Sequence, residues 1–169
     1  MDGRKAAVTY RAAFFLTYYG EKLTREERRK VAAILRELRS VKVELTACEE
    51  LTVRGDRHRL RQLLLNLADN AIKYNVPNGE VNLALRRVGN DAEFTIANTG
   101  AGIPAELLPR VFNRFFRGDA SHSSTVDGCG LGLSIAQWIV SAHRGSIEIA
   151  SEPANSTLVT VRLPLAAAR

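Results

Sequence analysis

A helical segment with a narrow polar stripe through otherwise apolar surface constrains this chain more than any other feature. The segment is QLLLNLADNAIKYN, residues 62–75. At about 100° per residue, five polar side chains fall within about a quarter of the circumference. They are Gln62, Asn66, Asp69, Asn70 and Lys73. A surface helix normally has one apolar face and one broad polar face. We therefore expect this helix to be buried on both flanks and to aim its amides and ammonium group at a ligand, because buried polar groups need partners.

Composition narrows the class of protein. The 169 residues suffice for one domain with a sizeable core, and 46% hydrophobic with 25% charged residues is the balance of a soluble globular chain. Apolar runs stay well below the roughly 18 residues that a membrane span needs, and no secretory signal follows Met1. The net charge of +6 suits an anionic partner, but no basic stretch resembles a nucleic-acid module. Cys48 and Cys129 lack metal spacing, and we interpret them as two reduced thiols.

Local patterns predict helices and strands along most of the chain. A capping box at Thr24 begins one helix, and Asp56 caps the helix that carries the polar stripe. Strands occur both between helices and in hairpins, which predicts a two-layer α/β sandwich with a mixed sheet. The predicted helices are 24–39, 57–75, a short helical piece at 104–116, and 131–142. The predicted strands are 41–45, 51–54, 81–88, 93–98, 145–151 and 158–163.

Domain boundaries follow from these patterns. We place one domain at residues 24–165, preceded by a segment of unclear role at 1–23 and followed by a tail at 166–169. Tyr10, Phe14 and Tyr18 have helical spacing within the first segment. This aromatic stripe either packs on the domain or forms a docking surface for a neighbour.

Two glycine clusters and an aromatic segment between them suggest a site. Asn98-Thr99-Gly100-Ala101-Gly102-Ile103 ends a predicted strand, and glycines there permit close approach to a flat ligand. Gly128-Cys129-Gly130-Leu131-Gly132-Leu133 leads into a helix, whose N-terminus favours phosphate. Between them, VFNRFFR carries two arginines that could reach phosphates. Each segment taken alone is equally compatible with a turn or a solvated surface.

Taken in order, these segments resemble the ATP-binding catalytic domain of sensor histidine kinases, part of the gyrase, heat-shock chaperone, histidine kinase and mismatch-repair ATPase superfamily. NLADNAIKYN resembles the N box of that family, NTGAGIP its first glycine box, VFNRFFR its F box and GCGLGLSIAQWIVSAHRG its second glycine box. The resemblance covers about residues 41–165. It implies a Bergerat-type fold, in which a mixed, mostly antiparallel sheet carries helices on one face.

The resemblance also implies a role for each matching residue. Asn70 would hold the Mg²⁺ that bridges the phosphates of ATP, Lys73 would contact phosphate, and Tyr74 would lie near the adenine. Asn98 would accept a hydrogen bond from the adenine amino group, and residues 104–127 would form the ATP lid. The other nucleotide-binding candidates are Gly100, Gly102, Ile103, Phe112, Gly128, Gly130, Leu131, Gly132, Leu133 and Thr157. Asn66, Lys73, Arg114 and Arg117 are the candidates for phosphoryl transfer.

Three positions bear on nucleotide binding and on the reaction. Two depart from the usual pattern of the family, and the third distinguishes branches of the superfamily. Most members have an aspartate at the position of Asn98. With asparagine, the adenine site would keep an acceptor oxygen but lose a negative charge. The usual glycine of the closing strand, near Thr157, is missing from PANST. Asn66 stands where hydrolytic branches carry a glutamate that activates water. An amide there implies slow hydrolysis and transfer that depends on positioning and charge neutralisation.

No histidine of this chain matches the phosphoacceptor box of the family. His58, His122 and His143 lie at the start of a helix, in the lid and before a glycine turn, and we interpret them as structural or surface residues. The resemblance therefore implies a two-component kinase domain that phosphorylates a histidine on a separate dimerisation domain. Expected partners are ATP, that domain and a response regulator, with no nucleic acid and no membrane contact by this chain. The expected location is cytoplasmic, in a parent that is an inner-membrane sensor.

Two other functions stay open on the sequence. Asn98, the missing glycine and the missing acceptor are compatible with a degenerate module that binds a nucleotide or a partner without transfer. A superfamily ATPase or an anti-sigma-type serine kinase is the second alternative, against which Asn66 and the F box argue.

Overall fold

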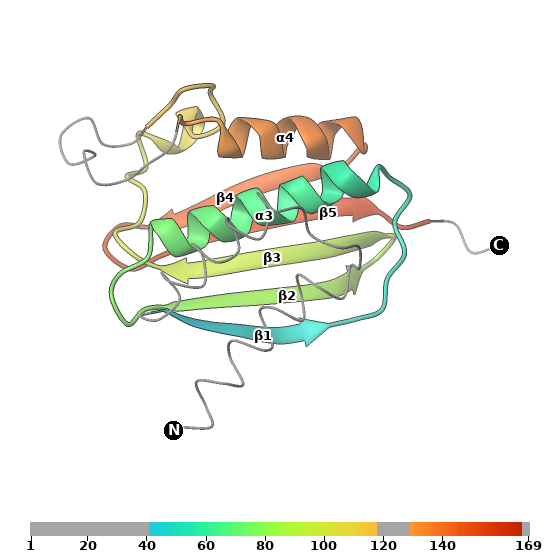
Figure 1. The fold of residues 1–169 in the computed structure, drawn as a ribbon, viewed down its shortest axis with the longest axis horizontal. Helices are drawn as coiled ribbons and strands as arrows, with labels where there is room; N and C mark the ends of the chain where they lie inside the picture. The colour runs from blue at the N-terminus through green and yellow to red at the C-terminus, as the bar shows by residue number, and fades with distance from the viewer. Residues whose placement is uncertain (1–40, 118–128, 167–169) are drawn as a thin grey trace, which may run out of the picture.

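The computed structural model describes residues 41–117 and 129–166, which form a sheet with helices on one face (Figure 1). The strands are β1 (Lys42–Cys48), β2 (Glu80–Val88), β3 (Asp91–Thr99), β4 (Ser146–Glu152) and β5 (Ser156–Pro164). The helices are α3 (Arg57–Lys73), α4 (Gly132–Ala142) and the single-turn 3-10 helix η1 (Leu108–Arg110). Five strands lie in the order β1-β2-β3-β5-β4; β1 runs parallel to β2, and the other neighbours are antiparallel. The predicted two-layer sandwich with a mixed, mostly antiparallel sheet is confirmed.

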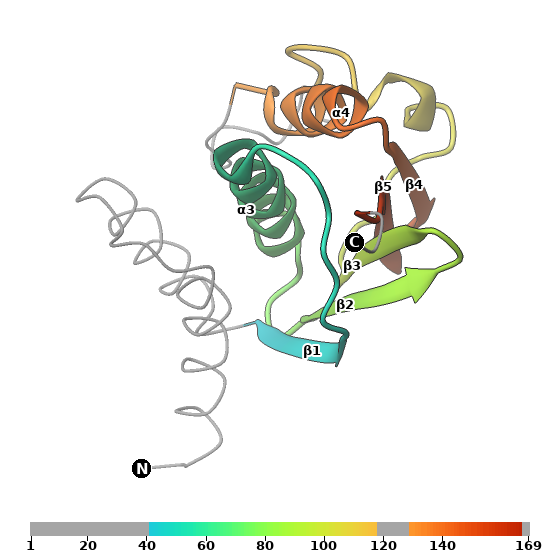
Figure 2. The same ribbon diagram turned by 90° about the vertical axis from the view of Figure 1, so that its right-hand side faces the viewer.

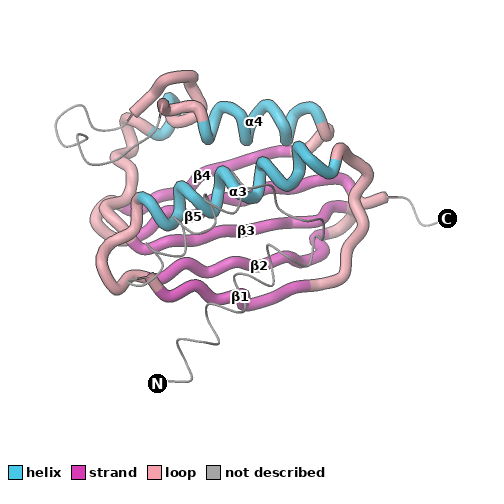
Figure 3. Tube along the Cα trace, viewed as in Figure 1, coloured by secondary structure: helices cyan, strands magenta, loops and turns pink. Residues whose placement is uncertain are grey.

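The core lies between the sheet and two antiparallel helices. Figure 2 shows α3 and α4 on the same side of the sheet, and Figure 3 shows the two layers as cyan helices over magenta strands. The most deeply buried side chains are Leu63, Leu67, Ala136, Ile139 and Val140 from the helices and Val81, Ile96 and Val161 from the strands. Of the polar stripe on α3, Asn66, Asn70 and Lys73 are half-buried, whereas Gln62 and Asp69 are exposed. The half-buried part of the stripe is therefore its C-terminal part.

A histidine joins the start of α3 to the end of α4. The Asp56 carboxylate caps α3 by accepting hydrogen bonds from the N–H groups of His58 at 2.9 Å and Arg59 at 3.1 Å. Chiefly the Arg59 hydrogen bond holds the pKa of Asp56 below its usual range. The backbone N–H of Asp56 donates to Nε2 of His143 at 3.0 Å, and Nδ1 of His143 lies 2.7 Å from the Ile139 carbonyl oxygen. A carbonyl only accepts, so these two contacts correspond to the tautomer of His143 that carries its proton on Nδ1, and the ring joins the two helices.

Two predicted elements are wrong. Residues 51–54 form no strand; Val53 makes a single bridge to Leu165, because the segment passes the end of β5 and finds no strand to pair with. Residues 104–116 form turns around η1 rather than a longer helix. Pro109 has no N–H to continue an α-helical hydrogen-bond pattern through this segment.

Several predictions lie outside the described residues. They are the segment at 1–23, the helix at 24–39, residues 118–127 of the predicted lid, and the end of the tail at 167–169. His122, in that part of the predicted lid, and the candidate Gly128 are among these residues. Within the described ranges, none of the helices has the length and apolar character that a membrane span requires.

Candidate nucleotide site

The site begins where the C-terminal half of α3 meets the N-terminus of α4. The Asn66 amide donates to the Gly132 carbonyl oxygen at 3.4 Å. A Cβ atom on Gly132 would lie 3.5 Å from Nδ2 and 3.6 Å from Oδ1 of Asn70. Asn66 and Asn70, one helical turn apart, therefore both face the first residue of α4. This contact places the polar stripe directly against the start of the second helix.

The N-terminus of α4 is suited to an anion. The first N–H groups of an α-helix lack intrahelical partners, and the helix dipole places partial positive charge there. Leu131 occupies the N-cap position and offers no side-chain hydrogen bond, and the first turn carries no acidic residue. The backbone donors therefore remain available to phosphate oxygens. Lys73, half-buried on the same stripe as Asn70, adds a positive charge.

A second wall is formed by the end of β3 and the end of α3. Asn98 is only 9% exposed, and its Nδ2 donates to the Thr99 carbonyl oxygen at 2.8 Å. This bond fixes the amide so that Oδ1 remains as an acceptor. Thr157 lies opposite Asn98 in the β3–β5 register and shares its face of the sheet. A Cβ atom on Gly100 would overlap the Tyr74 carbonyl oxygen, so the loop lies directly on the end of α3.

Tyr74 completes this wall with an exposed aromatic ring. The residue is the C-cap of α3, and 56% of its surface is accessible. The Lys73 Nζ lies 5.8 Å from the centroid of the ring. An exposed ring beside a cation provides a surface on which a flat base could pack.

A serine that the sequence did not single out holds the rest of the first glycine box. Gly102 has a φ of +69°, which favours glycine, and its backbone approaches that of Glu152 too closely for a side chain. The Ile103 N–H donates to Oγ of Ser151 at 2.9 Å, and the same Oγ lies 2.8 Å from Oγ1 of Thr157. Ser151 thus links Ile103 to Thr157. A serine in a strand is too common to signal this role.

The segment that resembles the F box contacts the second glycine cluster. The Phe115 N–H donates to the Gly130 carbonyl oxygen at 3.0 Å. Gly130 has a φ of +66°, and a Cβ atom there would lie 2.7 Å from the Phe116 carbonyl oxygen. The Arg110 guanidinium lies 5.0 Å from the centroid of the Phe116 ring. The segments on either side of residues 118–128 are therefore in contact.

Comparison with known proteins identifies the family. The sequence matches the family described as histidine kinase-, DNA gyrase B- and HSP90-like ATPase over residues 55–167. The chain belongs to this ATPase family. Over 137 residues it is 38% identical to the sensor-like histidine kinase SenX3 of Mycobacterium tuberculosis, an alignment that covers 81% of this chain and 33% of SenX3. The chain thus spans about a third of the length of that relative.

Solved structures support the same assignment. A solved structure of the mycobacterial sensor histidine kinase MprB aligns with a TM-score of 0.70 at 32% identity, over 82% of this chain and 92% of the chain in that structure. Full-length ShkA in complex with AMPPNP aligns with a TM-score of 0.68 at 26% identity, over 83% of this chain and 29% of ShkA. The prediction of an ATP-binding catalytic domain of the histidine kinase type is confirmed.

The predicted residues fall into three groups in this ATPase domain. Asn66, Asn70 and Gly132 meet at the start of α4, with Leu131 and Leu133 half-buried beside them. Tyr74, Asn98, Gly100 and Thr157 lie around the end of β3, next to Gly102 and Ile103. Phe112, Arg114, Arg117 and Gly130 lie in the two segments that flank residues 118–128, and both arginines are exposed while Phe112 is half-buried. The structure therefore brings the boxes together in adjoining groups, and the roles of the individual residues stay predictions.

The donor set fits Mg²⁺ held mainly by a nucleotide. The described residues contain no group of three His, Cys, Asp or Glu side chains that could hold a metal ion. Mg²⁺ typically takes one or two protein ligands and completes its shell with water and phosphate oxygens. The Asn70 carboxamide oxygen, next to the anion-favouring start of α4, is compatible with such a shared ion.

Proposed function

We propose that this ATPase-family domain binds Mg-ATP between α3, α4 and the loop after β3. It then transfers the γ-phosphoryl group to a histidine on a separate dimerisation domain in two-component signal transduction. The observation that carries this proposal is the meeting of Asn66 and Asn70 with Gly132 at the start of α4, where no side chain caps the helix. The names of the relatives, which are sensor histidine kinases, support the reaction class.

The chemistry assigned to each group follows from its position. Asn70 would hold the Mg²⁺, while the α4 N-terminus and Lys73 would neutralise phosphate charge. Oδ1 of Asn98 would accept from the adenine amino group, since its Nδ2 is already used. When bound, Mg²⁺ would neutralise charge on the phosphate oxygens, as in other phosphoryl transfers. Arg114 and Arg117, exposed at the base of the lid, would approach the phosphates.

Asn66 favours transfer over hydrolysis. An amide is a poor general base and cannot abstract a proton from water at neutral pH. An imidazole acceptor brings its own lone pair, so it needs little deprotonation before it attacks phosphorus. Positioning and charge neutralisation then supply most of the acceleration.

Titration with nucleotide tests the binding step. We expect the chain to bind ATP more tightly with Mg²⁺ than without it, measured by isothermal calorimetry. Asn70→Ala should remove most of the Mg²⁺ dependence. Gln62→Ala is the matched control, because Gln62 lies on the same stripe of the same helix but is exposed. Failure to bind ATP at millimolar concentration would refute the nucleotide site.

A reconstituted reaction tests the transfer step. Adding a dimerising histidine domain with labelled ATP should produce acid-labile, base-stable phosphate on that domain. Binding without such phosphate would favour the degenerate module, and rapid release of inorganic phosphate by the chain alone would favour the hydrolytic alternative.

We further infer the setting of this domain in its parent protein. The catalytic domain would comprise residues 24–165 with its lid at 104–127, and 1–23 and 166–169 would lie outside it. The parent would be an inner-membrane sensor with this domain in the cytoplasm, and a response regulator would take the phosphoryl group from the histidine.

A further inference from the structure

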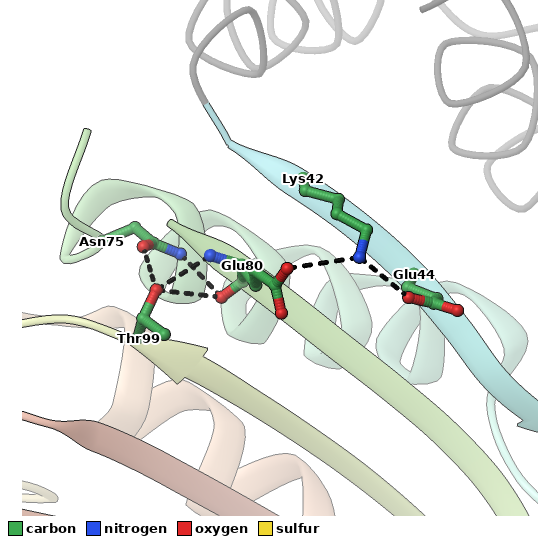
Figure 4. A network of polar contacts seen from close by, with 5 residues as sticks. All are labelled: Lys42, Glu44, Asn75, Glu80 and Thr99. Atoms are coloured by element: carbon green, nitrogen blue, oxygen red, sulfur yellow. Dashed lines mark hydrogen bonds and ion pairs between the residues drawn. The ribbon is translucent and has the colours of Figure 1, made fainter. Parts of the chain in front are cut away.

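A compact hydrogen-bond cluster ties the end of α3 to the end of β3 (Figure 4). The Thr99 hydroxyl donates to Oδ1 of Asn75 at 2.7 Å and accepts from the Glu80 N–H at 2.8 Å. Nδ2 of Asn75 donates to the Glu80 carbonyl oxygen at 3.0 Å. The same Oδ1 accepts from the Val76 N–H at 2.8 Å. The Asn75–Thr99 pair, 24 residues apart in sequence, is thus held through β2 as well as directly.

The cluster leaves the two side chains little freedom. Nδ2 of Asn75 also donates to the Ala71 carbonyl oxygen at 3.4 Å, so both ends of the carboxamide are engaged. An amide flip would set its NH₂ group against the Val76 N–H, a contact between two donors. Gly79 packs against the pair so closely that a Cβ atom there would overlap Oδ1 of Asn75 and Oγ1 of Thr99. Orientation and separation of Asn75 and Thr99 are therefore both fixed.

The cluster lies within the second wall of the candidate site and connects its loop after β3 to Lys73, the last residue of α3. Asn75 directly follows Lys73 and Tyr74, which end α3. Thr99 directly follows Asn98 and precedes Gly100, whose backbone lies on the Tyr74 carbonyl oxygen. The ion pairs of Lys42 with Glu80 and Glu44 continue the network to β1, but these groups are exposed and contribute little. The Asn75–Thr99 hydrogen bond is thus the short connection between the end of α3 and the loop after β3.

We propose that Asn75 and Thr99 are positioning residues that set the separation between the phosphate-contacting end of α3 and the base-contacting loop after β3. This inference rests on the proposed nucleotide function. A ligand that contacts both Lys73 and the loop after β3 depends on this separation, whereas a ligand that contacts only one of them does not. Loss of the connection should therefore weaken ATP more than either of its halves.

The test uses Thr99→Val, which removes the hydroxyl and keeps the shape, in the full chain. We expect ATP to bind about tenfold more weakly, the size of one lost hydrogen bond. The affinities of adenosine and inorganic tripolyphosphate, tested separately as probes of the loop after β3 and of the phosphate-contacting residues, should change less than twofold. Thr99→Ser restores the hydroxyl and should restore ATP affinity. Thr95→Val is the matched control, since Thr95 is half-buried on the same strand and face, four residues earlier.

Equal losses for ATP, adenosine and tripolyphosphate would overturn the inference, because they indicate general damage to the fold. Unchanged ATP affinity in Thr99→Val would also overturn it, while leaving the proposed function intact if the wild type binds ATP. A wild type that binds no ATP would overturn both. If Thr99→Val does not fold, Asn75→Asp serves instead, since it keeps Oδ1 but sets a carboxylate oxygen against the Glu80 carbonyl oxygen. Hydrogen exchange of the Glu80 amide should accelerate in Thr99→Val, because that variant removes the hydroxyl that accepts from this N–H group, and unchanged protection would contradict the connection itself.

Discussion

Gly130→Ala tests whether the two sides of the lid meet as described. Gly130 has a φ of +66°, and Gly89 in the turn between β2 and β3 has a φ of +61°. An alanine at either position meets the same backbone strain, about 1 kcal/mol. The surroundings differ, because a Cβ atom on Gly89 meets no heavy atom within 4 Å. Gly89→Ala is therefore a control that carries the strain alone.

The added cost at Gly130 comes from steric overlap. Its Cβ atom would lie 2.7 Å from the Phe116 carbonyl oxygen, 2.9 Å from the Phe115 carbonyl carbon and 3.1 Å from the Phe115 Cα. Reaching van der Waals contact requires a displacement of roughly 0.7 Å, and all three obstructing atoms are backbone. Overpacking of this kind costs about 1–3 kcal/mol. We expect Gly130→Ala to lower the free energy of unfolding by about 2–4 kcal/mol and Gly89→Ala by about 1 kcal/mol.

Urea denaturation followed by circular dichroism measures both costs. ATP affinity should fall only in Gly130→Ala, because the shift separates the F box from the start of α4. Equal destabilisation by the two alanines would refute the described contact between Phe115 and Gly130. Unchanged ATP affinity with the larger destabilisation would instead place this contact outside the nucleotide site.

Two further predictions concern stability. Ile139→Ala should lower the free energy of unfolding by about 2–5 kcal/mol in urea denaturation, because Ile139 is fully buried. Leu158→Ala, at a position 38% exposed, should lower it clearly less, and equal losses would contradict the described core. Asp56 has a pKa below its ordinary value of 3.8, so its ionised form stabilises the folded chain above that pH and the contribution is lost as the pH falls through the lowered pKa. Melting temperatures between pH 7 and pH 3 should therefore fall less steeply for Asp56→Asn, which keeps a capping oxygen without the charge; parallel curves would refute the assignment.

Local chemistry was enough to predict most elements of this fold. Asp56 marks the start of α3 because a carboxylate can accept from the free N–H groups of the first turn. Gly89 marks the β2–β3 hairpin, since the turn needs a positive φ. The predicted strand at 51–54 failed because a strand depends on a neighbour to pair with, and that neighbour is fixed by the tertiary fold. Short apolar runs carry no information about such a partner.

The residues of the candidate site likewise include some that local sequence chemistry predicted and some that it could not predict. Gly102, Gly130 and Gly100 were predicted as site residues, and each has a backbone reason to be glycine, either a positive φ or a close approach. Asn75 and Ser151 were not predicted. Their roles depend on hydrogen bonds to residues distant in sequence, Asn75 to Thr99 and Ser151 to Ile103. Common polar residue types give no sign of which distant atom they will meet.

The Asn66 side chain combines a contact between two helices with a predicted role in the reaction. The family resemblance predicts that this residue separates phosphoryl transfer from hydrolysis. In the structure its Nδ2 donates to the Gly132 carbonyl oxygen and so holds the start of α4 against α3. An ionised glutamate has no donor for that carbonyl and would set a negative oxygen near it. Introducing a general base here would therefore also loosen the start of α4, so we expect that a change to hydrolysis at this position would require a different contact between the two helices.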